Sequence, residues 1–393
     1  MNLFFLTSRF PFPLDRGDKL RAYHQIKVLS KHFDIQLISL SDTVVSSQDL
    51  AALQPFCSSI EVHQLSKFQS VLQLFLGIFI KRPFQVSYFY SPNIQNKILK
   101  QLRANPDVKV VAQLIRMRPY VLPIDSGRTV LDFQDAFSLN MKRRASHSSW
   151  WNRWFFQWES ALVKDYEGEC INDFGHCAII SEPDRLAIED TKKQTIFLLK
   201  NGVDVDYFNI QNIDNQLINE KKDKKITLSF VANLGYFPNI IASEYLVNKI
   251  FDRLDAQKYC VLLAGARPAQ KVKNLASENV NISGWYDDIR NAYLESDILV
   301  APIFSGSGQQ NKILEALAMQ VPVVTTSQVA AGINATEAVL MIANTPSEFQ
   351  TCIELLSDNQ ILYKKYQVNG RMFVEKHFSW EAATLPLCEV LKD

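Results

Sequence analysis

Short apolar runs alternate with longer segments of helical spacing along the whole chain. A continuous apolar run is typical of a strand that is buried on both faces of a parallel sheet. Strands that alternate with helices predict an α/β fold built from doubly wound sheets. The expected strands are residues 3–6, 35–40, 60–63, 109–114, 129–132, 177–181, 196–199, 227–232, 261–264, 280–283, 298–301, 321–326 and 339–342.

A polar stretch at residues 211–225, rich in Asn, Asp and Lys, interrupts this pattern. Such composition is typical of a linker. It is preceded by Asn201-Gly202, a dipeptide that marks a turn. A chain of 393 residues has room for two domains of about 200 residues each. The sequence therefore predicts two domains that meet near this region.

Composition excludes several classes of protein. Hydrophobic residues make up 47% and charged residues 21%, so the chain can form large cores and is not disordered. A net charge of +1 argues against a nucleic-acid protein that depends on a global basic field. The six cysteines are scattered without metal-ligand spacing, and we expect reduced core residues in a cytoplasmic protein.

The N-terminus and the apolar runs give no sign of export or membrane insertion. Met1-Asn2-Leu3-Phe4-Phe5-Leu6 lacks a basic leader region, so we expect a first strand and not a signal peptide. The longest apolar run, residues 71–80, has about half the length that a bilayer requires. We therefore expect no membrane-spanning segment.

The strongest candidate site lies at residues 305–319, where a small-residue loop leads from a strand into a helix. Gly306, Ser307 and Gly308 would let a ligand approach the backbone. A helix N-terminus suits a diphosphate, and Lys312 adds a full cation. Glu315 shares that face and is suited to accept hydrogen bonds from ribose hydroxyls. The alternative for Lys312 and Glu315 is an ordinary surface ion pair, but the apolar residues around them favour a ligand.

This block, G-x-x-x-K-x-x-E-A-x-A-x-x-x-P-V-V, resembles the donor-binding segment of family 4 retaining glycosyltransferases. Among them it is most similar to bacterial sugar transferases of exopolysaccharide and exosortase (PEP-CTERM) systems. Glu315 matches the second glutamate of the family's E-x7-E motif. Ser307 stands where the family has the first glutamate, a departure that leaves the donor sugar open.

The resemblance implies the GT-B fold, with two Rossmann-like domains that face each other across a cleft. The expected boundaries are 1–205 for an N-terminal acceptor-side domain and 206–376 for a nucleotide-sugar-binding domain. A final helix at 377–393 is expected to pack back on the first domain.

Candidate residues in the first half follow the ends of strands, where ligands bind in open α/β sheets. Gly17 resembles the family's glycine loop, and Arg116 stands near the position of a histidine that contacts the donor sugar. A structural salt bridge is the alternative for Arg116. Asp132 and Asp135 could form a carboxylate pair for general acid/base work, and Asp135 is the catalytic candidate.

Two further residues of the second half are candidates for donor binding. Arg267 could help neutralise the diphosphate, and Trp285 either stacks on the base or belongs to the core. Asp204-x-Asp206 matches a metal-binding signature of a different glycosyltransferase fold, but a turn explains it better. No metal site and no cofactor are expected, because the helix start and Lys312 occupy the place of a cation.

Two segments combine apolar or aromatic residues with cations. One is residues 68–84, which contains Lys81 and Arg82, and the other is residues 142–158, which contains four tryptophans. Basic residues beside tryptophans suit a lipid headgroup interface at the inner face of the plasma membrane. The same aromatic residues follow the spacing of a core helix, so both interpretations stand.

The favoured function is transfer of a sugar from a UDP- or GDP-linked donor to the hydroxyl of a glycan or lipid-linked acceptor in cell-surface polysaccharide synthesis. The resemblance implies a retaining, hexosyltransferase-type enzyme. One alternative is a sugar-nucleotide epimerase of the same fold, and another is a non-catalytic two-domain ligand-binding protein. The donor base, the acceptor, the linkage and the oligomeric state are not indicated by the sequence.

Overall fold

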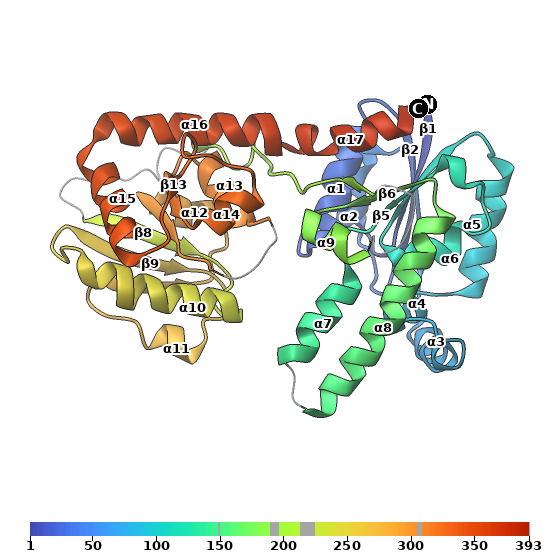
Figure 1. Ribbon diagram of the computed structural model, residues 1–393. Coiled ribbons are helices and arrows are strands. Elements are labelled where there is room, and N and C mark those ends of the chain that lie inside the picture. The colour runs from blue at the N-terminus through green and yellow to red at the C-terminus, as the bar shows by residue number, and fades with distance from the viewer. Residues whose placement is uncertain (148–149, 189–195, 213–224, 305–308, 393) are drawn as a thin grey trace. The chain divides into compact units, whose positions relative to one another are not determined.

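The computed structural model describes residues 1–392 apart from 148–149, 189–195, 213–224 and 305–308. The chain divides into two compact units (Figure 1). The first unit comprises Met1–Asn201 together with Ala383–Asp393. The second unit comprises Gly202–Ala382.

The first unit is built on a parallel sheet which, in the described residues, has seven strands in the order β3-β2-β1-β4-β5-β6-β7. These strands are β1 (Asn2–Thr7), β2 (Asp34–Ser41), β3 (Ser59–Gln64), β4 (Lys109–Gln113), β5 (Thr129–Asp132), β6 (His176–Ile179) and β7 (Phe197–Leu198). The helices are α1 (Gly17–Leu29), α2 (Ser47–Leu53), α3 (Lys67–Phe79), α4 (Phe84–Tyr88), α5 (Pro92–Ala104), α6 (Arg118–Val121), α7 (Phe137–His147), α8 (Trp150–Asp173), α9 (Glu182–Ile188) and most of α17 (Trp380–Lys392).

Two apolar cores lie on the two faces of this sheet. Successive strand side chains point to opposite faces, so Phe4 and Leu6 of β1 enter one core while Leu3 and Phe5 enter the other. Leu387 and Leu391 of α17 belong to the second of these cores, so the C-terminal helix is part of the first unit's interior. Burial on both faces explains why the strands are continuous apolar runs.

The second unit has a parallel sheet in the order β10-β9-β8-β11-β12-β13. These strands are β8 (Ile226–Val231), β9 (Tyr259–Ala264), β10 (Val280–Gly284), β11 (Ile298–Ala301), β12 (Val323–Thr325) and β13 (Met341–Ile342). The helices are α10 (Phe237–Tyr245), α11 (Gln270–Lys273), α12 (Arg290–Leu294), α13 (Asn311–Ala318), α14 (Ser327–Gly332), α15 (Pro346–Asp358) and α16 (Gln360–Phe378).

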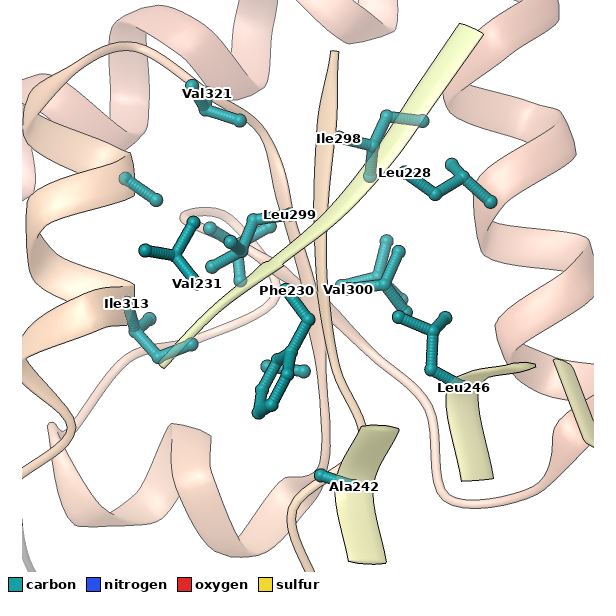
Figure 2. Close-up of a cluster of buried hydrophobic side chains, with 14 of the residues drawn as sticks. Leu228, Phe230, Val231, Ala242, Leu246, Ile298, Leu299, Val300, Ile313 and Val321 are labelled. Atoms are coloured by element: carbon teal, nitrogen blue, oxygen red, sulfur yellow. The ribbon is translucent and has the colours of Figure 1, made fainter. Parts of the chain in front are cut away.

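The core of the second unit forms around its central strands. Figure 2 shows Phe230 and Val300 in the middle of the cluster, with Ile313 of α13 on one side and Leu246 on the other. All four side chains are fully buried. The start of α13 is therefore fixed against β8 and β11, which matters for the site described below.

Each predicted strand is present, and the α/β fold with two doubly wound sheets is confirmed. In both sheets the strand order reverses beside the first strand, between β1 and β4 and between β8 and β11. Ligands of open α/β sheets bind at such a point, outside the carboxyl ends of the strands. The topology thus places one candidate site in each unit.

No helix in the described part of the chain is both long enough and apolar enough to cross a bilayer. The six cysteines are all unpaired, as expected, although Cys57, Cys260 and Cys352 are only partly buried.

Candidate functional site

A cavity of about 570 Å³ lies at the carboxyl edge of the second sheet. Residues that follow β8 and β9 form one wall, and α12 and the start of α13 form another. The residues that line this cavity include Asn239, Gly265, Trp285, Tyr293, Lys312 and Glu315.

The first turn of α13 brings Lys312 and Glu315 to the cavity wall. Gln309 and Asn311 line the same cavity, so the N-terminal end of the helix faces it. The opposite side of α13 is anchored in the core by five residues: Ile313, Leu314, Ala316, Leu317 and Ala318. A helix start offers unpaired N–H groups and partial positive charge, which suit a phosphate group.

Lys312 is a cation held in a largely desolvated place. Its Nζ donates a hydrogen bond to Oδ1 of Asn239 at 2.8 Å and lies 4.7 Å from the ring centre of Phe230. Burial lowers the pKa of Lys312 to about 8, and the charge of Glu315 opposes that change. An anion bound beside Nζ would favour the protonated form. The surroundings of Lys312 are thus suited to a negatively charged ligand.

Glu315 is bound by a different partner. The hydroxyl of Tyr293 donates to Oε2 of Glu315 at 2.7 Å. Burial raises the pKa of this carboxyl, while the Tyr293 hydroxyl and Lys312 act in the opposite direction. Within the described ranges no hydrogen bond to Oε1 is present, so Glu315, which lines the cavity, has an acceptor available for a ligand. Lys312 and Glu315 therefore do not form the surface ion pair that was the alternative explanation.

Trp285 lies at the edge of this cavity and is not a core residue. The residue is 73% exposed, so its indole is accessible for stacking. Gly284 before it has a φ of +73°, a left-handed conformation that glycine adopts without strain. At Gly265, a Cβ atom would lie 1.7 Å from the carbonyl oxygen of Ala232. Only glycine lets the ends of β8 and β9 approach this closely at the cavity.

Arg267 does not reach the cavity. Its side chain is exposed, and the residue is absent from the cavity lining, so the expected contribution to the diphosphate site is not supported by the geometry of this unit. Gly306, Ser307 and Gly308 lie outside the described residues. Of the expected donor-binding set, the second unit brings together Trp285, Lys312 and Glu315.

The first unit has its own cavity, of about 290 Å³, at the carboxyl ends of β1, β4, β5 and β6. Gly17, Arg116 and Asp135 all line it, so three expected residues meet there. A larger cavity of about 630 Å³ adjoins it and shares Arg9, Arg116 and Phe137. The larger cavity extends to aromatic residues of α4 and α8.

Arg9 and Arg116 give the first-unit cavities an excess of positive charge. Both guanidinium groups lie against the ring of Phe89, at 5.1 Å and 4.6 Å. Asp18 is 2.7 Å from Arg9 and 3.9 Å from Arg116, so one carboxylate faces two cations. Burial and the neighbouring Arg9 lower the pKa of Arg116 to about 9. The Nε atoms of both arginines are buried without a partner in the described residues, which favours an anionic ligand.

Asp132 does not pair with Asp135 for acid/base work. Both of its oxygens accept hydrogen bonds from Arg21, at 2.7 Å and 3.0 Å, and Gln25 adds a third. Arg21 and Asp132 are almost fully buried, so this is a structural ion pair. Burial, with the charge of Asp184 next, raises the pKa of Asp135. Of this pair, Asp135 is the residue that remains available for proton transfer.

The Asp204-x-Asp206 segment forms a turn, because Oδ1 of Asp204 accepts from the backbone N–H of Tyr207 at 3.0 Å. In the part of the chain that the structure describes, no three side chains are grouped as a metal site would require. The turn interpretation of this segment is therefore the one that the geometry supports.

Comparisons with known proteins agree with this geometry. Residues 225–359, which include the Lys312 cavity, match the family described as Glycosyl transferases group 1. A glycosyltransferase from Rickettsia africae has a TM-score of 0.65 at 15% identity, over 100% of this chain and 98% of that one. The structure of Anabaena HepE in complex with UDP has a TM-score of 0.64 at 13% sequence identity, and the match covers 100% of both chains. WaaG, a glycosyltransferase involved in lipopolysaccharide biosynthesis, has a TM-score of 0.60 at 14% sequence identity. That match covers 99% of this chain and 98% of the WaaG chain.

The fold is that of GT-B glycosyltransferases. The search of curated proteins gave no match. The fold expectation is thus confirmed, while the family match is confined to residues 225–359, which lie within the second unit.

Three residues at the cavities were missed in the sequence. Arg9 stands two residues after the first strand, and this position after a strand end was the sequence signal that could have indicated a cavity residue. Asn239 and Tyr293 had no such signal, because an asparagine in the first turn of α10 and a tyrosine in the five-residue α12 match no motif. Each contacts Lys312 or Glu315 only through the tertiary fold.

Proposed function

We propose that this protein is a retaining glycosyltransferase that moves a sugar from a nucleotide-diphosphate donor to the hydroxyl of a glycan or lipid-linked acceptor. The observation on which this depends is the cavity in which Lys312, Glu315 and the start of α13 meet. The match of residues 225–359 to Glycosyl transferases group 1 supports it.

The donor fits this cavity in three parts. The diphosphate lies at the start of α13 beside Lys312, the ribose hydroxyls donate to Glu315, and the base stacks on Trp285. HepE, solved with UDP and with UDP-glucose, supports a nucleotide sugar of this kind. UDP- and GDP-linked sugars both meet these chemical requirements.

Catalysis by Lys312 follows from how charge develops in the reaction. As the glycosidic bond breaks, the leaving diphosphate gains negative charge. A buried ammonium and a helix start stabilise that charge more in the transition state than in the bound donor, which lowers the barrier. The proton of the acceptor hydroxyl passes either to the departing phosphate oxygen or to Asp135 on the acceptor side. Retention of configuration and the polysaccharide (exosortase-associated) context rest on the family resemblance of residues 306–324.

The first unit would hold the acceptor. Arg9 and Arg116 supply an anion site, and the adjoining cavity is lined by Phe84, Phe155 and Phe156. This combination suits an acceptor in which a phosphate group joins a glycan to an apolar chain. Asp135 is the candidate for proton transfer on this side.

A transfer assay tests the proposal. Purified protein is incubated with UDP- and GDP-sugars, with and without lipid-linked glycan acceptors, and nucleotide release is followed. We expect release that increases with acceptor and a glycosylated product. Release of the nucleotide with an epimerised free sugar would instead indicate the epimerase. Nucleotide binding without turnover would indicate the non-catalytic ligand-binding protein.

A further inference from the structure

Helix α3 of the first unit presents its apolar face to solvent. Large apolar side chains recur at intervals of three and four residues, as in an amphipathic helix, yet this stripe is exposed. Phe79 is 83% exposed. The stripe consists of Phe68, Val71, Leu72, Phe75, Leu76 and Phe79. The face that packs on the protein has the small residues Ser70 and Gly77 instead.

The position of α3 is fixed by its contact with α4. A Cβ atom on Gly77 would lie 2.2 Å from Oγ and 2.9 Å from Cβ of Ser87, so the two helices are in close contact there. Rotation of α3 to bury the stripe would bring bulky side chains into this contact. The apolar face therefore points outward as part of the folded unit.

The start of α8 extends this surface. Trp150, Trp151 and Trp154 are each about 70% exposed. The ring of Phe84 on α4 contacts Phe155 at 5.3 Å, so α8 lies against the helix on which α3 rests. Leu74 of α3 lines the same cavity as Phe155 and Phe156 of α8, so the two helices are neighbours (Figure 1). We call the exposed stripe of α3 together with these three tryptophans the α3–α8 surface.

The chain segments that form the α3–α8 surface carry charges of one sign. Residues 62–90 and 136–158 contain seven Lys and Arg and not a single Asp or Glu, although the whole chain has a net charge of +1. Lys67, Lys81, Lys142 and Arg153 are exposed at or near this surface. A large apolar stripe, tryptophans and an unbroken excess of cations together match the interface of an anionic bilayer.

We propose that the α3–α8 surface docks on an anionic lipid bilayer. α3 lies in the plane of the headgroups with its stripe among the acyl chains, the tryptophans lie at headgroup level, and the cations contact lipid phosphates. A helix of 13 residues is too short to span the membrane, so the contact is peripheral.

Vesicle flotation tests this proposal with the full-length protein. The probes are vesicles of phosphatidylcholine and vesicles of phosphatidylcholine mixed with phosphatidylglycerol. We expect the protein to float with the mixed vesicles, to lose binding as salt is raised, and to show a blue shift of tryptophan emission. We expect a Phe75→Ser/Phe79→Ser variant to bind at least tenfold more weakly, with an unchanged circular dichroism spectrum and melting temperature because both side chains are exposed.

The matched control changes two exposed apolar residues of the second unit, Ile361→Ser and Met372→Ser, and should leave binding unchanged. Failure to bind mixed vesicles, or equal binding by the α3 variant, would overturn the proposal. Self-association that the α3 variant abolishes, in the absence of vesicle binding, would show that a second copy covers the surface instead. Nucleotide binding can be measured without lipid, so this test is independent of the proposed transferase function.

Discussion

Lys312 acts as a cation only while it holds its proton. Burial lowers the pKa of Lys312 to about 8 in the free protein, so its charge is lost as pH rises through this value. The charge of Glu315 opposes this lowering but does not restore the usual pKa of a lysine. The proposed transition-state stabilisation therefore depends on pH near neutrality.

We predict that kcat/KM for the donor falls above about pH 8, because the free protein then has an uncharged lysine. In a Lys312→Arg variant the guanidinium stays protonated, so kcat/KM should not fall in this pH range. Its value should be lower at every pH, because a guanidinium differs in shape from an ammonium group. The measurement is kcat/KM between pH 6 and pH 10. A parent profile that is flat across pH 8 would contradict the assigned role.

Arg116 is predicted to serve the acceptor. We expect Arg116→Ala to lower acceptor-dependent transfer by about 100-fold, as loss of a charge-assisted hydrogen bond would. Donor hydrolysis should change by less than about threefold. Arg118→Ala is the control, because Arg118 pairs with Asp173 and Glu169 and does not line the cavity. Equal losses of hydrolysis and transfer in Arg116→Ala would place this residue on the donor side instead.

Local sequence was sufficient for some of these residues and not for others. Lys312 and Glu315 were identified because three-residue spacing after a small-residue loop fixes both on one helix face. The buried ion pair of Asp132 was not predictable, since a carboxylate at a strand end looks the same in sequence whether a ligand or Arg21 binds it. Its partner is 111 residues away in the sequence, and no local pattern indicates that contact.

Among the helices, α7 and α8 are joined by a buried carboxylate. Glu167 of α8 accepts from the backbone N–H of Ser138 at 3.3 Å and from its hydroxyl at 2.5 Å. Burial raises the pKa of Glu167 to about 7. The folded state thus keeps this proton up to about pH 7, whereas the unfolded chain releases it near pH 4.5. The stability that this proton provides is full below about pH 4.5 and is lost as pH rises towards 7.

We predict that Glu167→Gln raises the free energy of unfolding at pH 8 by about 1–3 kcal/mol, because the neutral amide avoids the cost of a buried charge. At pH 5, where the parent glutamate is protonated, the gain should be small. Urea unfolding followed by tryptophan fluorescence measures this, since four of the six tryptophans lie on α8.

The exposed neighbour Glu169 is the control for this test. Glu169→Gln removes an ion pair with Arg118 that is partly exposed, and it should change stability by less than about 1 kcal/mol at both pH values. The same gain for Glu167→Gln at pH 5 and pH 8 would contradict the assigned protonation.

The strands were predictable from sequence because burial on both faces produces continuous apolar runs. The orientation of α3 was not. The spacing of Phe68, Phe75 and Phe79 shows that one face of the helix is apolar, but spacing does not show what that face meets. The tight contact of Gly77 with Ser87 decides the question, and that contact exists only in three dimensions.

At the scale of the whole molecule, the two units repeat one design with different chemistry. Both sheets reverse their strand order beside the first strand, and both have a cavity there. The second unit offers one cation, one carboxylate and a helix start, which suit a nucleotide diphosphate. The first unit offers two arginines beside aromatic residues, which suit an anionic acceptor.

The most direct test of the central claim is calorimetric binding of UDP and GDP to the parent protein and to two variants. We predict that the parent binds one of the two nucleotides with micromolar affinity. In Glu315→Ala the affinity should be lower by about 10- to 100-fold, because a hydrogen bond from a ribose hydroxyl to a charged carboxylate is lost. Lys312→Ala should weaken binding of the nucleoside diphosphate but leave binding of the nucleoside unchanged. Parent-like binding of the diphosphate by both variants, or no nucleotide binding by the parent, would contradict the account.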